Sequence, residues 1–157
     1  MTKPLFKWTG GKGRLFDKYE KLGFFPHPDE FDTFVDLFFG AGAVTCWVHD
    51  LYPDKPIIIN DLNSELVFMY RQIRDNWSQF LEEYTRTFNR FLDTPIDKRK
   101  ALYNAYKKDY CWQYDCLTDV ELAATLLVLL KTNFNGIWQS YIMYGRRYST
   151  RCYLSVR

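Results

Sequence analysis

The stretch "DLFFGAGAV", residues 36–44, determines the fold prediction, together with "IIIND" at residues 57–61. Residues 33–38 are rich in β-branched and aromatic side chains, which favours a strand. A Gly-rich turn and an apolar helix follow, and Pro53 and Pro56 end that helix. Residues 57–60 are a short continuous apolar run, which is typical of a buried parallel strand. The order strand, turn, helix, strand predicts a right-handed βαβ unit.

A block of helices is predicted after this unit. From Leu66 to Phe91, apolar residues recur at steps of three and four, which places them on one helix face. We expect Asn76 to interrupt this helix and cap a new turn, and Thr94 to cap the next helix, with Pro95 at its first position.

The last predicted helix begins with a capping box, "TDVE" at residues 118–121. It is apolar on nearly all sides, so we expect it to be buried, with Gly136 as its C-terminal stop. The sequence thus predicts an α/β fold with an incomplete parallel sheet and a helical subdomain. The expected divisions are residues 1–65, 66–140 and a basic, aromatic tail at 141–157.

The segment "FKWTGGKGRLFDKY", residues 6–19, resembles a phosphate-binding loop only superficially. That loop needs Ser or Thr after its lysine, and here Lys12 is followed by Gly13. A turn before an amphipathic helix is the simpler interpretation, with four apolar residues on one face: Leu15, Phe16, Tyr19 and Leu22.

Composition excludes several classes of protein. The chain has 157 residues, 47% of them hydrophobic and 25% charged, which is typical of a globular domain. The four cysteines lack CxxC spacing and there are two histidines, so no metal site is expected. The apolar run at 122–130 is too short to span a bilayer, and the N-terminus lacks the apolar run of a signal peptide. We expect a cytoplasmic protein with reduced cysteines.

The glycine turn and Asp61 together indicate a nucleoside site. Asp61 ends the second predicted strand, where a carboxylate can accept hydrogen bonds from both ribose hydroxyls. The third glycine of the dinucleotide fingerprint is replaced by Thr45, which weakens a pyrophosphate interpretation. Asp36, before the turn, would repel a pyrophosphate but can pair with an ammonium group.

Four ordered segments carry a resemblance to a known family. They are "FKWTGGK", "DLFFGAGAV", "NDLNSELVFMYRQIR" and "LLVLLKTNFNGIW", which together extend from Phe6 to about Gly136. In this order they resemble the DNA adenine-N6 methyltransferases of the Dam type, the D12 class. The sequence departs from that pattern at Leu37, where the family usually has Pro, and at Asp36, where it often has Glu.

The resemblance implies a Rossmann-like fold that binds S-adenosylmethionine. Trp8 and Lys12 would then lie against the cofactor, and Asp61 would hold its ribose. The turn beneath the cofactor would be formed by Phe38, Gly40 and Gly42. A sulfonium cation gains from aromatic faces and from nearby carboxylates such as Asp36.

Double-stranded DNA is the partner that the family implies. Asn133 and Asn135 can bond base edges, although they can equally cap the buried helix. In the tail, aromatic and basic residues alternate, which suits stacking and phosphate contacts. The candidates there are Tyr141, Arg146 and Arg147. Solvated helix faces are the alternative interpretation of the other basic clusters, at residues 98–100 and 107–108.

The family's catalytic "DPPY" segment has no counterpart in these 157 residues, since no two prolines are adjacent and no Asp or Glu follows Glu121. Three explanations stay open: a truncated frame or fragment, one subunit of a split enzyme with a second polypeptide, or a repurposed binding protein. We therefore expect no methylation by this chain alone. The alternatives are a non-catalytic nucleoside- or DNA-binding module, and a protein–protein adaptor with an apolar patch at the open sheet.

Overall fold

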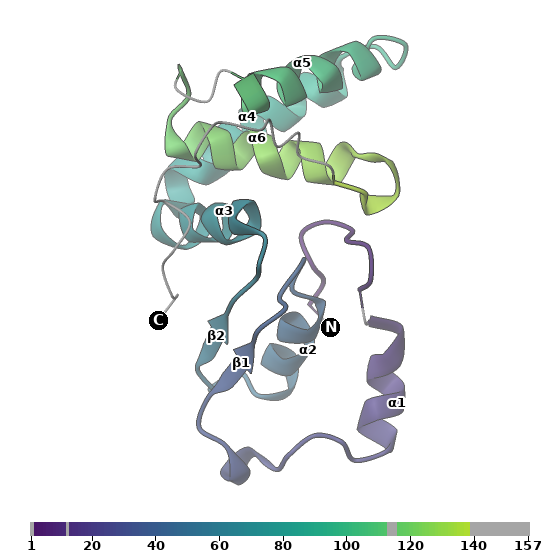
Figure 1. Cartoon of the computed structure of the whole chain (residues 1–157), viewed down its shortest axis with the longest axis vertical. Helices are drawn as coiled ribbons and strands as arrows, with labels where there is room; N and C mark the ends of the chain where they lie inside the picture. The colour runs from purple at the N-terminus through teal and green to yellow at the C-terminus, as the bar shows by residue number, and fades with distance from the viewer. Residues whose placement is uncertain (1, 12, 113–115, 139–157) are drawn as a thin grey trace.

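The computed structural model describes residues 2–11, 13–112 and 116–138, and its first half contains the predicted βαβ unit (Figure 1). Strand β1 (Phe34–Asp36) and strand β2 (Ile57–Ile59) pair in parallel, with Val35 opposite Ile58. Helix α2 (Ala43–Leu51) connects them. The parallel pair is confirmed, with shorter strands than expected; in the described chain the sheet has two strands, so a full Rossmann-like sheet stays a prediction.

The N-terminal helix covers α2 through aromatic contacts. A 3-10 turn, η1 (Gly13–Leu15), leads into α1 (Phe16–Lys21), and a second, η2 (Pro28–Glu30), precedes β1. The Phe16 ring stacks on Trp47 at 4.8 Å between centroids. The predicted apolar face was wrong in part: only Phe16 is buried in α1, and Leu22 is 55% exposed because it lies beyond the short helix.

Four helices form the second half of the described chain: α3 (Ser64–Asp75), α4 (Trp77–Asp93), α5 (Arg99–Trp112) and α6 (Asp119–Thr132). Helix α6 packs against the other three and is buried on nearly all sides, as its sequence predicts. The Thr118–Glu121 capping box that starts it is confirmed. Division of the chain into three regions at residues 65 and 140 stays a prediction.

Three predicted helix ends were wrong in detail. Asn76 interrupts the helices and is the N-cap residue of α4 as predicted, but its side chain makes no capping hydrogen bond and donates to Gln72 instead. Thr94 bonds back to the Arg90 carbonyl and so ends α4; residues 95–98 form a turn before α5. Helix α6 ends at Thr132, and Gly136 closes a separate 3-10 turn, η4 (Phe134–Gly136).

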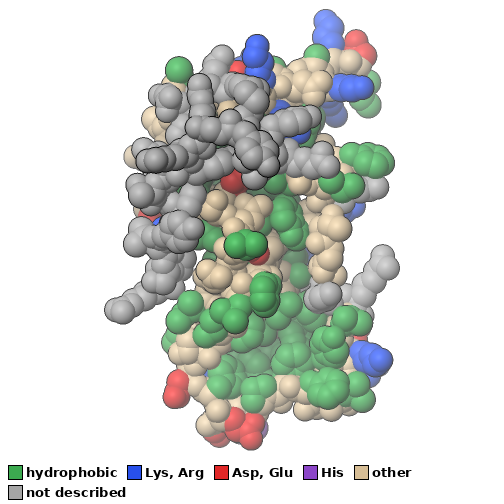
Figure 2. All heavy atoms as spheres, in the orientation of Figure 1, with side chains coloured by type: hydrophobic (Ala, Val, Ile, Leu, Met, Phe, Trp, Pro, Cys, Tyr) green, Lys and Arg blue, Asp and Glu red, His purple; other side chains and the backbone are tan. Residues whose placement is uncertain are grey.

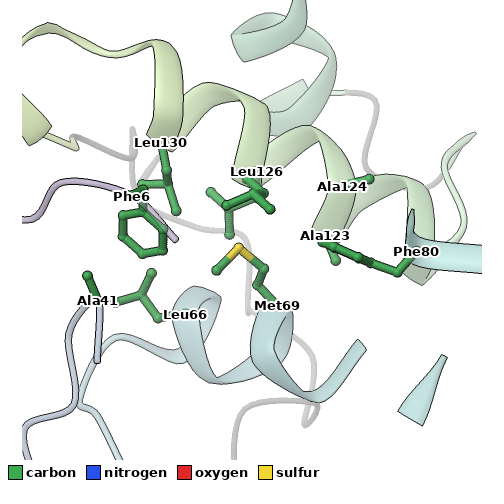
Figure 3. Close-up of a cluster of buried hydrophobic side chains, with 10 residues drawn as sticks. Phe6, Ala41, Leu66, Met69, Phe80, Ala123, Ala124, Leu126 and Leu130 are labelled. Carbon is green, nitrogen blue, oxygen red and sulfur yellow. The ribbon is translucent and has the colours of Figure 1, made fainter. Parts of the chain in front are cut away.

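The core of the helical half extends to the N-terminal segment and the glycine turn. Figure 3 shows Phe6 between Leu130 of α6 and Leu66 of α3, with Ala41 of the turn beside them. These side chains are nearly all excluded from water. Burial of a ring such as Phe6 contributes about 1.5–3 kcal/mol, so the core holds the glycine turn against the helices.

Gly42 is the turn position at which a side chain should be tolerated least. Its φ is +81°, and an added Cβ would lie 2.6 Å from the Phe39 ring. We expect Gly42→Ala to lower the free energy of unfolding by roughly 2–5 kcal/mol, from left-handed strain and overpacking.

Gly23→Ala is the matched control for this prediction, measured by urea unfolding. Gly23 has φ +65°, but an added Cβ meets nothing within 4 Å. It should therefore lose only about 1–2 kcal/mol, from backbone strain alone. Equal losses in the two variants would contradict the role of the Phe39 contact.

Candidate functional site

A cavity of about 1170 Å³ opens where the two halves of the chain meet. Its walls come from four segments that are far apart in the sequence: the N-terminus, the turn after β1, the end of β2 and the end of α6. The lining residues are 3–11, Asp36, 38–41, 43–44, Asp61, Leu130, Lys131, Asn133 and Gly136. A cavity of this size accommodates a nucleoside-sized ligand with room to spare.

The glycine turn brings backbone close to the cavity. Gly40 has φ +52°, and an added Cβ would lie 3.0 Å from Cδ1 of Trp8, so the indole packs directly on the turn. Gly42 donates its N–H to the Phe39 carbonyl at 2.7 Å and accepts from Cys46 of α2. Gly42 is not a lining residue; it shapes the turn from beneath.

Asp61 ties the end of β2 to this turn. Its Oδ2 accepts from the Gly40 N–H at 2.7 Å, and its Oδ1 accepts from the Asn63 N–H at 2.8 Å. An ionised carboxylate offers about four acceptor positions, so each oxygen keeps one for a ligand. The carboxylate thus both fixes the turn and presents acceptors to the cavity.

Asp36 has a different environment at the end of β1. It is 9% exposed, and its Oδ2 accepts from the Thr45 hydroxyl at 2.7 Å. The Phe38 N–H approaches its other oxygen at 3.2 Å. Thr45 occupies the position of the missing third glycine and gives the buried Asp36 carboxyl a hydrogen-bond donor, a role that its sequence position alone did not indicate.

The N-terminal segment meets the end of the helical block. An added Cβ on Gly136 would lie 2.7 Å from the Lys7 carbonyl oxygen, and the Thr9 hydroxyl donates to the Gly136 carbonyl at 3.4 Å. Phe6 and Trp8 pack edge to face, with ring centroids 5.9 Å apart. The first and last segments of the family-like pattern therefore touch.

Tyr70 of α3 contacts the glycine turn without lining the cavity. Its hydroxyl donates to the Ala41 carbonyl at 3.2 Å, and its ring packs edge to face on Phe39. Burial raises the pKa of this phenol, so it stays a neutral donor. Sequence reasoning placed Tyr70 on a helix face but missed this contact, because the partner is a backbone carbonyl.

The predicted cofactor residues are largely brought together. Trp8, Asp36, Phe38, Gly40 and Asp61 line one cavity, and Phe38 stands at its margin, 87% exposed. Lys12 lies outside the described residues. Sequence analysis missed three further lining residues, Lys3 and Lys7 of the N-terminal segment and Lys131 of α6, whose ammonium lies over the Phe88 ring.

The predicted DNA-binding residues are only partly covered by the structure. Asn133 lines the cavity, and its buried Nδ2 has no partner among the described residues. Asn135 belongs to η4, but its side chain lies outside the described part, as do Tyr141, Arg146 and Arg147. The assignment of these five residues to DNA stays a prediction.

The described residues offer neither a metal site nor a membrane span. No group of three or more His, Cys, Asp or Glu side chains is arranged to hold a metal ion there. None of the described helices is both long and apolar enough to cross a membrane.

The family model and the relatives that match this chain indicate the same protein family. The family model of D12 class N6 adenine-specific DNA methyltransferase matches residues 8–145. The type II methyltransferase M1.LlaDCHI of Lactococcus lactis is 32% identical over 92% of this chain and 48% of its own length. M.MjaIII of Methanocaldococcus jannaschii is 28% identical over 87% of this chain and 48% of its own.

A third relative is the DNA adenine methylase of Haemophilus influenzae, 27% identical over 86% of this chain and 42% of its own length. The chain thus spans about half the length of the curated relatives it matches.

Proposed function

The chain belongs to the D12 class N6 adenine-specific DNA methyltransferases, and from this we propose that it forms the cofactor-binding and DNA-reading half of such an enzyme. The observation that supports this most is the convergence of four separated segments on one cavity. A binding site requires residues from separated segments to converge, as they do at Trp8, Gly40, Asp61 and Gly136. A turn with a purely structural role has no such requirement.

S-adenosylmethionine is the ligand that we propose for the cavity. Asp61 would accept hydrogen bonds from its ribose hydroxyls with the acceptor positions that Gly40 and Asn63 leave unused. The Trp8 face suits the sulfonium, and Lys12 is assigned here by the family resemblance. Asp36 would favour the cationic end of the ligand, although its oxygens already have donors.

Duplex DNA containing adenine is the proposed substrate. Lys3 and Lys7 are among the residues that line the cavity and would add positive charge near a bound strand. We propose that Asn133 and Asn135 contact bases, and that Tyr141, Arg146 and Arg147 contact the strand.

S-adenosylmethionine would supply the activated methyl group for an in-line displacement by adenine N6. Because the N6 lone pair is conjugated into the ring, the enzyme must accept hydrogen bonds from the N6 amino group, which loses one proton on methylation, and must hold the flipped base. Asp36 and Asp61, the carboxylates among the described lining residues, already accept hydrogen bonds from neighbouring residues of the chain. We therefore propose that these 157 residues bind the cofactor but do not methylate DNA alone.

Two measurements on the purified chain test the proposal. Calorimetry should detect S-adenosylmethionine, with weak affinity because a complete site would also use the second half of the fold. Incubation with methyl-labelled cofactor and duplex DNA should give no labelled adenine. Failure to bind either S-adenosylmethionine or its demethylated product would refute the cofactor assignment, and labelled adenine would show that the chain holds its own catalytic groups.

A further inference from the structure

Glu65, in the first turn of α3, accepts hydrogen bonds from two aromatic side chains that come from other parts of the chain. The Tyr110 hydroxyl of α5 donates to its Oε1 at 3.0 Å, and the Trp138 indole N–H donates to its Oε2 at 2.8 Å. These donors lie 45 and 73 positions away in the sequence. One carboxylate therefore joins α3, α5 and the residues that follow η4.

The half-buried Trp138 is held by this cluster on more than one side. Its ring packs edge to face on Tyr110, with centroids 5.9 Å apart, and the Lys107 ammonium lies over the ring, 5.8 Å from its centroid. An indole N–H can only donate, and a partly buried one needs an acceptor. Glu65 is that acceptor, so this bond fixes the orientation of the ring.

The position of Glu65 depends on its backbone and not on its side chain. Asn63 donates its backbone N–H to Asp61 at 2.8 Å, and its side-chain oxygen caps α3 by accepting from the Glu65 N–H at 3.0 Å. Both bonds persist if the Glu65 side chain is shortened. Its truncation should therefore release Trp138 and leave the α3 cap and Asp61 in place.

Trp138 lies two residues beyond η4 and attaches this turn to α3 and α5. Gly136 attaches the same turn to the Lys7 backbone. Of the two proposed base contacts, Asn133 is the residue before the turn and Asn135 belongs to it. Residues that read a ligand need a backbone that is held by the groups around it.

We propose that Glu65 is a positioning residue for DNA recognition: through its bond to Trp138 it fixes the backbone of η4. This inference rests on the proposed function, in which Asn133 and Asn135 contact bases. A carboxylate repels phosphates, so Glu65 acts through the indole and not by touching the strand.

The charge of Glu65 gives this role a distinguishing sign. Helix α5, to which Glu65 is bonded, carries four basic residues and one acidic residue. Figure 2 shows Lys and Arg side chains over the end of the molecule that holds α5 in Figure 1. If Glu65 acted only by its charge, its removal beside basic residues would strengthen DNA binding. A positioning role predicts weaker binding.

The test compares specific with non-specific DNA binding by the purified chain. The probe is the duplex that wild type enriches most from a random-sequence pool, and fluorescence anisotropy at fixed salt gives its Kd. Glu65→Ala should raise this Kd at least tenfold, without weakening the binding of the unselected pool. Calorimetry should give an unchanged Kd for S-adenosylmethionine, which shows that the variant is folded.

Two further variants separate geometry from charge. Glu65→Gln should bind the selected duplex like wild type, because its amide oxygen can accept from Trp138 and its amide nitrogen can donate to the Tyr110 hydroxyl. Trp138→Phe keeps an aromatic ring without the N–H, so it should reproduce the loss seen in Glu65→Ala, and the double variant should lose no more. Glu82→Ala, which removes an exposed carboxylate of α4, is the matched control and should not weaken binding.

A readout without DNA completes the test. The Trp138 indole N–H signal, assigned by its loss in Trp138→Phe, should exchange with solvent at least tenfold faster in Glu65→Ala than in wild type. Unchanged exchange, or a selected-duplex Kd that is equal or lower in Glu65→Ala, would overturn the proposal and leave the proposed function standing. A wild type that enriches no duplex would instead refute the DNA-reading part of the proposed function, and this inference with it.

Discussion

Asp61→Ala is expected to lower the affinity for S-adenosylmethionine by at least a hundredfold. Two hydrogen bonds from ribose hydroxyls to a carboxylate contribute roughly 1.5–3 kcal/mol each, and about 1.4 kcal/mol corresponds to a factor of ten. The substitution also frees the Gly40 N–H, which Asp61 holds at 2.7 Å. Isothermal calorimetry at a fixed temperature and pH measures the change.

Asp61 can act by bonding the ribose directly or by holding the Gly40 turn, and a change in the ligand distinguishes these two effects. A cofactor analogue without ribose hydroxyls should bind wild type much more weakly than S-adenosylmethionine does, but Asp61→Ala should bind both equally weakly. Asp54→Ala, which removes an exposed carboxylate before β2, is the matched control and should leave binding unchanged. If wild type did not distinguish the two ligands, Asp61 would act only through the turn.

The βαβ unit could be predicted because its signals are local. The strand signal at 57–60, the prolines that end α2 and the glycines at 40 and 42 are all short-range features. Helix α6 was predictable for the same reason, since its capping box and its apolar composition are contiguous. The exposure of Leu22 was not predictable, because the spacing of apolar residues does not indicate where a short helix ends.

The partners of individual polar side chains were beyond sequence reasoning. Thr45 was noted as a departure from a glycine pattern, whereas the structure shows it donating to the buried Asp36. Thr94 has the sequence of an N-cap, but the Arg99 side chain, which donates to the Leu92 and Thr94 carbonyls, stabilises the end of α4 instead. The local sequence favoured Thr94 as the start of the next helix. The side chain of Arg99, five residues later, instead stabilises Thr94 as the end of α4.

Gly136 is the clearest example of a misassigned residue, because the backbone of Lys7, 129 positions earlier, leaves room only for a glycine there. The sequence indicated a helix stop, but α6 already ends at Thr132. What Gly136 provides is space: the Lys7 backbone passes where a Cβ would stand. A family pattern that contains both segments was the one signal that joined them.

Gly136→Ala is therefore expected to damage both stability and cofactor binding. The new Cβ would lie 2.7 Å from the Lys7 carbonyl oxygen and 3.0 Å from its carbon, at φ +72°. Neither atom belongs to a flexible side chain, so the N-terminal segment must move away from η4. Backbone strain and overpacking together should cost roughly 2–5 kcal/mol of unfolding free energy.

Displacement of Lys7 should also move Trp8, whose ring packs on Gly40 at the cavity wall. We expect the affinity of Gly136→Ala for S-adenosylmethionine to fall at least tenfold, measured well below its melting temperature so that the folded state is compared. Gly23→Ala, which has a positive φ and open space, should bind like wild type. A destabilised Gly136→Ala that kept full affinity would show that the contact between Gly136 and Lys7 holds the two halves together without shaping the cavity. Reduced affinity would instead mean that the end of the helical block sets the position of Trp8, so that any displacement of η4 on DNA binding would reach the cofactor site through this contact.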